Sequence, residues 1–148
     1  MTDQEQPVKP GQIPSDMKAF NEGIIREFRA SGGRLSGPMA ESRLLLLTTT
    51  GATSGRSRTT VVGYRPHGDR YLVIASNNGA VSHPAWYRNL LADPVATIEV
   101  GPEKFKVRAT TAEPDERDEL AAKIDYLERQ QKLTDREIPI VILERVEA

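Results

Sequence analysis

Six short β-prone segments, separated by turn residues, constrain the fold of this chain more than any other feature. Each has six or seven residues, is rich in leucine, β-branched or aromatic residues, and lies between stretches containing glycine, proline, asparagine or aspartate. Segments of this length and composition predict strands joined by turns. They span Arg43–Thr49, Thr59–Arg65, Arg70–Ser76, Val95–Val100, Phe105–Thr111 and Ile138–Glu144.

Local patterns also predict how some of these strands pair. The turn Pro66-His67-Gly68-Asp69 predicts a hairpin between Thr59–Arg65 and Arg70–Ser76, because proline fixes one backbone dihedral and glycine permits a positive one. Apolar and polar residues alternate in Phe105–Thr111, which is typical of a sheet with one solvated face. Ile138–Glu144 is apolar on both faces and is therefore expected to be a central or barrel-closing strand.

Three helices are expected around these strands. An apolar stripe at helical spacing predicts the first over residues 16–31, ending at Gly32 and Gly33. Prolines at favoured first positions predict the second over residues 84–92 and the third over residues 114–131. The stripe of the first helix consists of Phe20, Ile24, Ile25 and Phe28.

These elements together predict a mainly β, α+β fold. About six antiparallel strands would curl into a barrel, with the helices packed outside it. The chain has 148 residues, a length that suits one domain. We expect residues 1–14, which contain three prolines, to form a flexible tail, and residues 15–148 to form a single domain that includes helix 16–31.

Composition excludes much of ordinary catalytic chemistry. There is no cysteine, hence no thiolate nucleophile, iron–sulfur cluster or cysteine-built zinc site, and two histidines cannot make a three-histidine metal site. No paired-carboxylate constellation and no G-x-S-x-G elbow is evident, although a single histidine leaves a Ser-His-Asp triad open. We therefore expect no metal, and chemistry supplied by a cofactor.

Charge and hydropathy bear on partners and location. Apolar content is 38% and the net charge is -1, which argues against a disordered chain and against a nucleic-acid binder. The N-terminus is polar, unlike a signal peptide, and the longest apolar run, Leu44–Leu47, is too short to span a membrane. We expect a cytoplasmic protein, a monomer or homodimer, whose first helix packs on the barrel, covers the active site or makes weak peripheral contact with a membrane.

The loop GATSGRSRTT is the first candidate site. It follows an apolar strand and offers backbone N–H groups, hydroxyls and the guanidinium groups of Arg56 and Arg58, the donors that a phosphate or carboxylate needs. The spacing is not that of a P-loop. An ordinary polar hairpin loop with two solvated arginines is the alternative.

The second candidate is SNNGAVSHPAW, beginning at Ser76. Its Asn-Asn-Gly either makes a simple tight turn or grips the polar edge of a ligand. His83 is a cap, a surface residue or an acid–base group. Trp86 is the only tryptophan and is either a core anchor or a wall against a planar ring.

At these residues the sequence resembles a known family. LLLLTTTGATSGRSRTT (Leu44–Thr60), DRYLVIASNNGAVSHPAWYRNLLADP (Asp69–Pro94) and TDREIPIVILE (Thr134–Glu144) resemble the deazaflavin (coenzyme F-420)-dependent nitroreductase family of the flavin/deazaflavin oxidoreductase superfamily. The resemblance runs from about residue 35 to residue 146. It implies a split β-barrel like the FMN-binding split barrels.

The resemblance also implies an activity. Members bind coenzyme F-420, a 5-deazaflavin with a phosphodiester and a lactyl-oligoglutamate tail, and the reduced coenzyme gives a hydride from C5 to quinones, nitroaromatics or activated enones. Ser76 is the candidate for a hydrogen bond to the acceptor, Ser54 and Arg58 for the phosphate or tail, and Gly63, Tyr64 and Tyr126 for the substrate wall. Implied coenzyme contacts are Ala52, Thr53, Ser54, Arg56, Arg58, Thr59, Thr60, Ser76, Asn77, Asn78, Gly79, Ala85, Trp86, Tyr87 and Asn89.

Departures from the family pattern leave alternatives open. Ala52-Thr53 stands where the family often has Arg-Lys, so coenzyme binding is weaker or Arg56 compensates. Only Tyr126 precedes the Thr-Asp-Arg motif, where nitroimidazole-reducing members have several tyrosines, so a different substrate wall is expected. The alternatives to the reductase are a non-catalytic deazaflavin-binding or storage protein and an FMN-dependent reductase on the same barrel.

Overall fold

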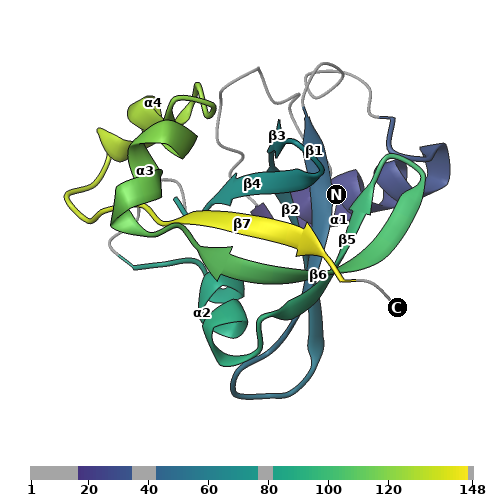
Figure 1. The fold of residues 1–148 in the computed structure, drawn as a ribbon. Helices are drawn as coiled ribbons and strands as arrows, with labels where there is room; N and C mark the ends of the chain where they lie inside the picture. Colours follow the sequence, from purple (N-terminus) through teal and green to yellow (C-terminus); the bar gives the residue numbers. More distant parts are fainter. Residues whose placement is uncertain (1–16, 35–42, 77–81, 147–148) are drawn as a thin grey trace.

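One antiparallel sheet organises the molecule (Figure 1). The computed structural model describes residues 17–34, 43–76 and 82–146. Within them, the sheet has seven strands in the order β2-β1-β5-β6-β7-β4-β3. The strands are β1 (Leu44–Thr50), β2 (Ser57–Gly63), β3 (Arg65–His67), β4 (Arg70–Ile74), β5 (Val95–Val100), β6 (Glu103–Thr111) and β7 (Ile140–Arg145).

The sheet is curled because its two edge strands are neighbours in the chain. β2 and β3 lie at opposite edges, yet only Tyr64 separates them. A single residue spans at most about 3.6 Å, so the two edges must come together. The result is a half-barrel, which confirms the expected α+β class built on a curled antiparallel sheet.

This topology corrects one predicted hairpin. Residues 59–63 do not pair with β4. They belong to β2, which pairs with β1 from Leu44↔Gly63 to Thr50↔Ser57. Only the three residues of β3 pair with β4 around the predicted turn. The tight loop between β1 and β2, closed by a 2.8 Å hydrogen bond from Gly51 N–H to the Arg56 carbonyl, brings β2 first against β1.

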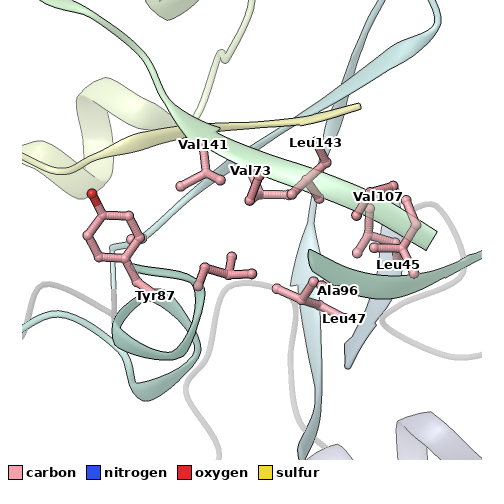
Figure 2. Packing of buried hydrophobic residues seen from close by; sticks show 12 residues of the cluster. Leu45, Leu47, Val73, Tyr87, Ala96, Val107, Val141 and Leu143 are labelled. Carbon is pink, nitrogen blue, oxygen red and sulfur yellow. The ribbon is translucent and has the colours of Figure 1, made fainter. Parts of the chain in front are cut away.

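β7 lies between β6 and β4 and separates two apolar clusters, as expected for a central strand. Val141 and Leu143 join side chains from β1, β4, β5, β6 and α2 inside the curl, where Figure 2 shows them converging. Ile140 and Ile142 point the other way and pack under the C-terminal helices. Both faces of β7 are therefore buried, which explains its continuous apolar run.

The helices lie around this sheet (Figure 1), and one differs from expectation. They are α1 (Met17–Ser31), α2 (Ala85–Ala92), α3 (Pro114–Ala121) and α4 (Leu127–Gln131). The single helix predicted over residues 114–131 is wrong, because residues 122–126 interrupt it. Short backbone bonds, such as Lys123 N–H to the Leu120 carbonyl at 3.0 Å, tighten the chain there and keep Ile124 buried.

Helix α1 docks on the chain's own sheet. Ile24 and Phe28 are buried, and the Arg29 guanidinium donates two hydrogen bonds, at 3.1 and 2.8 Å, to the carboxylate of Glu99 on β5. The helix ends where Gly33 donates to the Phe28 carbonyl at 2.8 Å. Of its predicted stripe, Phe20 lies outside the residues whose side chains are described. None of the described helices is both long and apolar enough to cross a membrane.

Gly33 is a stability test of this docking. Its φ is +93°, and a Cβ there would overlap the backbone of Gly101 in the β5–β6 turn. We expect Gly33→Ala to lower the free energy of unfolding by about 1–2 kcal/mol for the left-handed backbone and about 1–3 kcal/mol more for the overlap. Chemical denaturation measures this cost.

Gly55→Ala is the matched control. Gly55 has a φ of +71° but nothing within 4 Å of its Cβ position, so only the backbone cost applies. Equal destabilisation by the two variants would contradict the close packing of Gly33 on Gly101.

Candidate functional site

A cleft of about 880 Å³ opens between the β1–β2 hairpin, the end of β4, helix α2 and helix α4. Its polar wall comes from the loop after β1 and from the outer part of β2. Its apolar wall comes from the inner part of β2, from Ile74, and from the start of α2. The cleft is lined by Thr49, Gly51, Ala52, Thr53, Ser54, Arg58, Thr60, Val61, Val62, Gly63, Ile74, Ser76, Pro84, Ala85, Trp86, Arg88, Asn89, Tyr126 and Gln130.

The β1–β2 loop is folded tightly around Gly51. Gly55 N–H donates to the Gly51 carbonyl at 2.9 Å, and Arg56 N–H donates to Ser54 Oγ at 3.1 Å. A Cβ on Gly51 would lie 2.6 Å from Ser54 Oγ, so a larger residue would displace this hydroxyl. Ser54 Oγ accepts this bond from the loop, which leaves its own hydrogen available for donation elsewhere.

Asn89 joins helix α2 to this loop. Its Nδ2 donates to Thr49 Oγ1 at 3.1 Å, and its Oδ1 accepts from Ala52 N–H at 3.0 Å. Asn89 and Thr49 are both buried. A buried amide whose donor and acceptor are both used fixes direction as well as distance, so Asn89 sets how the loop faces α2 across the cleft.

On the opposite side of the cleft, which we call its floor, Arg136 contacts both the segment that follows β4 and the segment that precedes α2. Its guanidinium donates to the Ala75 and Ser76 carbonyls, at 3.1 and 2.7 Å, and lies 3.0 Å from His83 Nδ1. Burial lowers the pKa of His83 first, and the positive charges of Arg136 and Arg88 lower it further. His83 is therefore neutral near pH 7 and accepts at Nδ1.

The α4 side of the cleft holds two buried polar atoms that have no hydrogen-bond partner among residues 17–34, 43–76 and 82–146. They are Tyr126 Oη and Gln130 Oε1, which are buried and line the same cleft. Burial raises the pKa of Tyr126, so its phenol is neutral near pH 7. The Arg65 guanidinium lies over the Tyr126 ring, 4.6 Å from its centre, and pairs with Asp125 at 2.7 Å.

Partnerless buried polar atoms are costly, by about 1–3 kcal/mol each, and a bound ligand, ion or water recovers that cost by completing the bonding. The cleft therefore has two ends of different chemistry. Donors and the Arg58 guanidinium lie at the loop end. A neutral phenol and an amide oxygen lie at the α4 end, and Trp86 provides an aromatic surface along the wall.

A family model for F-420H(2)-dependent quinone reductase matches residues 23–145, most of the chain. The chain belongs to this family. It is 39% identical over 108 residues to an F-420H(2)-dependent quinone reductase of Mycobacterium tuberculosis, covering 68% of this chain and 72% of that protein. The resemblance of the sequence to deazaflavin-dependent oxidoreductases is thereby confirmed.

One solved structure supports the same family, and a second is similar in fold. An F-420-H2-dependent reductase, FDR-A, is 31% identical with a TM-score of 0.61, covering 69% of this chain and 94% of that one. A second solved chain, described as a domain-swapped dimer, is 28% identical with a TM-score of 0.63, covering 83% of this chain and 95% of that one.

Most of the site residues predicted from the sequence line the cleft of this chain. These are Ala52, Thr53, Ser54, Arg58, Thr60, Gly63, Ser76, Ala85, Trp86, Asn89 and Tyr126. Asn77, Asn78 and Gly79 lie outside the described residues. The position of a residue on the cleft supports a role in binding, and the roles themselves are proposed below.

Four predicted residues do not line the cleft. Thr59 points to the other face of β2, where its hydroxyl lies 2.7 Å from that of Thr48. Tyr64 packs edge-on against Tyr71 at 5.6 Å. Thr59 lies on strand β2, where successive side chains point to opposite faces, whereas Tyr64 lies between β2 and β3 and packs on Tyr71 of β4.

The remaining two are Arg56 and Tyr87. Arg56 is exposed on the loop and is not among the lining residues. Tyr87 lies in the core, with its hydroxyl 2.8 Å from Thr111 Oγ1. On a helix, neighbouring residues point in different directions, so Trp86 faces the cleft while Tyr87 does not.

Sequence reasoning missed Thr49, Arg88, Gln130 and Arg136. Gln130 is four residues after Tyr126, a spacing that places both side chains on one face of a helix, and this signal was available. Arg136 was visible only as part of the Thr-Asp-Arg motif. Its partners lie 53 to 61 positions earlier in the chain, so no local pattern reveals them.

Asn89 offers a direct test of the cleft's construction. We expect Asn89→Ala to lower the free energy of unfolding by about 2–4 kcal/mol, because it leaves the buried Thr49 hydroxyl and the part-buried Ala52 N–H without their partner. Urea denaturation measures this loss. Leu91→Ala, on the exposed face of the same helix, is the control and should change stability by no more than about 0.5 kcal/mol. A similar small effect for Asn89→Ala would show that the amide does not join α2 to the loop.

Proposed function

We propose that this chain transfers a hydride from reduced coenzyme F-420 to a quinone, and that both bind in the cleft between the β1–β2 loop, α2 and α4. Membership of the F-420H(2)-dependent quinone reductase family supports the reaction. The observation that carries the location is the pair of partnerless buried atoms, Tyr126 Oη and Gln130 Oε1, which face the same cleft as the cationic loop.

The loop end fits the anionic part of the coenzyme. The guanidinium of Arg58 and the hydroxyls of Ser54 and Thr60 line the cleft there and would bind the phosphodiester or tail. The fold of the loop around Gly51 holds these donors at one end. Arg56, exposed beyond the cleft, is left as the candidate contact for a tail that extends outward.

The middle of the cleft fits a planar ring system. Trp86 offers an aromatic surface, and Ser76 lies at the end of β4 on the cleft floor. When bound, reduced F-420 supplies the hydride from its C5 position. What the chain contributes is proximity and alignment, which in favourable cases lower a barrier by about 7–11 kcal/mol.

The α4 end fits the acceptor. A quinone gains negative charge on a carbonyl oxygen as it is reduced, and the Tyr126 hydroxyl can donate a hydrogen bond to that oxygen. Because burial raises the pKa of Tyr126, its phenol keeps its proton over the neutral range and remains a donor. The Ser76 hydroxyl is the second candidate donor to the acceptor.

The finer assignments are also proposals. Nitroaromatics and activated enones are further acceptors, since each places charge on an oxygen within reach of the same donors. The cytoplasmic location, the monomeric or dimeric state and the membrane contact of α1 stay predictions. Burial of Ile24 and Phe28 against the chain's own sheet favours intramolecular docking of α1 over membrane contact.

The acceptor assay separates the reductase from a storage protein. We expect saturable oxidation of F-420H2 by menadione above the rate without enzyme, followed by the return of the oxidised coenzyme's absorbance. Tight coenzyme binding with no oxidation across a panel of quinones, nitroaromatics and enones would contradict the reductase and favour storage.

Arg58 tests the loop end. We expect Arg58→Gln to raise the dissociation constant of F-420 by about tenfold or more, because it removes a charge-assisted hydrogen bond worth about 1.5–3 kcal/mol. Fluorescence titration at two salt concentrations measures this, and the wild type should show the steeper salt dependence. The control is Arg70→Gln, the same loss of charge in a surface pair with Glu144. Equal effects of the two variants would mean that only net charge matters.

Tyr126 tests the acceptor end, with opposite expected signs for stability and activity. Tyr126→Phe should leave the free energy of unfolding unchanged or higher, because it removes a buried hydroxyl that has no partner in the part of the chain that the structure describes. It should lower kcat/KM for menadione about tenfold, the effect of one lost hydrogen bond.

Steady-state kinetics and denaturation of the same preparation measure both quantities. The control is Tyr71→Phe, which removes a phenol hydroxyl from a ring packed against Tyr64 and Phe105. It should leave kcat/KM unchanged. If Tyr126→Phe instead lowers stability with kcat/KM intact, the hydroxyl has no role at the acceptor.

A further inference from the structure

The two chain segments that form the cleft floor are tied together from outside the cleft. Ser76 ends the β4 side, and Pro84 and Ala85 begin the α2 side. Arg136, on the connection between α4 and β7, is not a lining residue, yet it contacts both sides through the Ser76 carbonyl and the His83 ring. The residues that line the floor are therefore next to atoms that Arg136 holds.

Arg136 is itself held in place. The Gln131 side chain donates to the carbonyls of Thr134 and Arg136, at 3.3 and 2.6 Å, and accepts from Ile138 N–H at 3.0 Å. These bonds fix the connection on both sides of Arg136. Its planar guanidinium therefore presents donors in set directions, which a lysine ammonium cannot reproduce.

His83 can accept from Arg136 only in its neutral form. Arginine has no acceptor, so His83 Nδ1 must be unprotonated and the ring hydrogen lies on Nε2. The titratable and charged groups around the ring are Arg136, Arg88, which donates to the His83 carbonyl, and Tyr87, whose ring packs edge-on at 5.0 Å. Protonation would remove the acceptor and place a second cation against Arg136.

We propose that Arg136 is a positioning residue: by holding the Ala75 and Ser76 carbonyls and the His83 ring together, it sets the spacing of the β4 and α2 sides of the cleft and the orientation of Ser76 toward the ligand. This inference rests on the proposed function, in which Ser76 and the start of α2 contact the coenzyme and acceptor. It adds a residue that touches neither ligand.

Protonation of His83 links coenzyme binding to pH. The neutral form of His83 makes the bond, and the pKa of His83 lies below its ordinary value. Coenzyme binding should therefore be constant near pH 7 and weaken as the pH falls through the pKa of His83, where protonation breaks the contact. A plot of F-420 affinity against pH should therefore fall on its acid side, and this fall, the acid limb, reports on the Arg136–His83 contact.

Four variants test this. Arg136→Gln should raise the dissociation constant of F-420 at pH 7 by at least about tenfold, and Arg136→Lys should recover only part of the loss. His83→Asn, whose Oδ1 can replace Nδ1 but cannot be protonated, should bind as the wild type at pH 7 and lose the acid limb. His83→Ala should bind more weakly at pH 7 and also lose the acid limb.

One control variant and one ligand-free readout separate positioning from general stability. Arg117→Gln removes a nearby arginine that pairs with Glu137 at 3.6 Å, and it should leave F-420 binding unchanged. NMR titration of the His83 ring, assigned against the other histidine, gives a readout that needs no ligand. In Arg136→Gln the pKa of His83 should rise toward its ordinary value, because a neighbouring positive charge is gone.

The outcomes are distinguishable. An unchanged His83 pKa in Arg136→Gln contradicts the contact. A shifted pKa with F-420 binding and kcat/KM within twofold of the wild type contradicts the positioning role. An acid limb that persists in His83→Asn contradicts the link between this contact and pH. No binding of F-420 by the wild-type chain contradicts the proposed function, and the NMR result still decides the contact.

Discussion

The path of the chain between β2 and β3 is the constraint on which the rest of the structure depends. These strands lie at opposite edges of the sheet but are separated only by Tyr64, so the sheet has to curl until its edges meet. Curling buries one apolar cluster inside the sheet and leaves the other for α3 and α4 to cover. It also brings β2, the end of β4 and α4 around one cleft. The site is thus a direct result of the topology.

Apolar packing closes this fold, but polar bonds shape its site. Hydrophobic burial is non-directional, whereas a buried hydrogen bond fixes orientation. Asn89 orients the β1–β2 loop against α2, and Arg136 joins the end of β4 to His83, which precedes the N-cap of α2. Tyr126 and Gln130 differ from Asn89 and Arg136, since their buried polar atoms have no partner within the described residues. These two unpaired atoms lower the stability of the free protein, and a ligand that bonds to them restores that stability.

How much the sequence predicts depends on whether the information is local. Strands β5 and β6 were predicted closely, because each is a short β-prone segment and the alternation of β6 lies within one stretch. The predicted hairpin of residues 59–65 with β4 was wrong. These residues lie between two turns, and residues 59–63 pair across the first turn with β1, which leaves only β3 to pair with β4. The predicted helix over residues 114–131 failed where burial of Ile124 and the Arg65–Asp125 pair favour a tighter chain.

The candidate site shows the same division. Ser54, Arg58 and Trp86 belong to motifs that carry the family resemblance, and all three line the cleft. Tyr87 and Thr59 lie in the same motifs but point elsewhere, which only the backbone geometry reveals. Arg136 acts across some 60 positions of sequence, and no pattern within the chain indicates its partners.

The central claim is that the cleft binds a deazaflavin coenzyme through its loop end. Side-by-side fluorescence titration of the wild-type chain with F-420 and with FMN tests it most directly. The account predicts saturable binding of F-420 at a lower concentration than FMN, because the loop end offers Arg58 and hydroxyl donors to an extended anionic tail. Saturable binding of FMN in the micromolar range, with none for F-420, would contradict it.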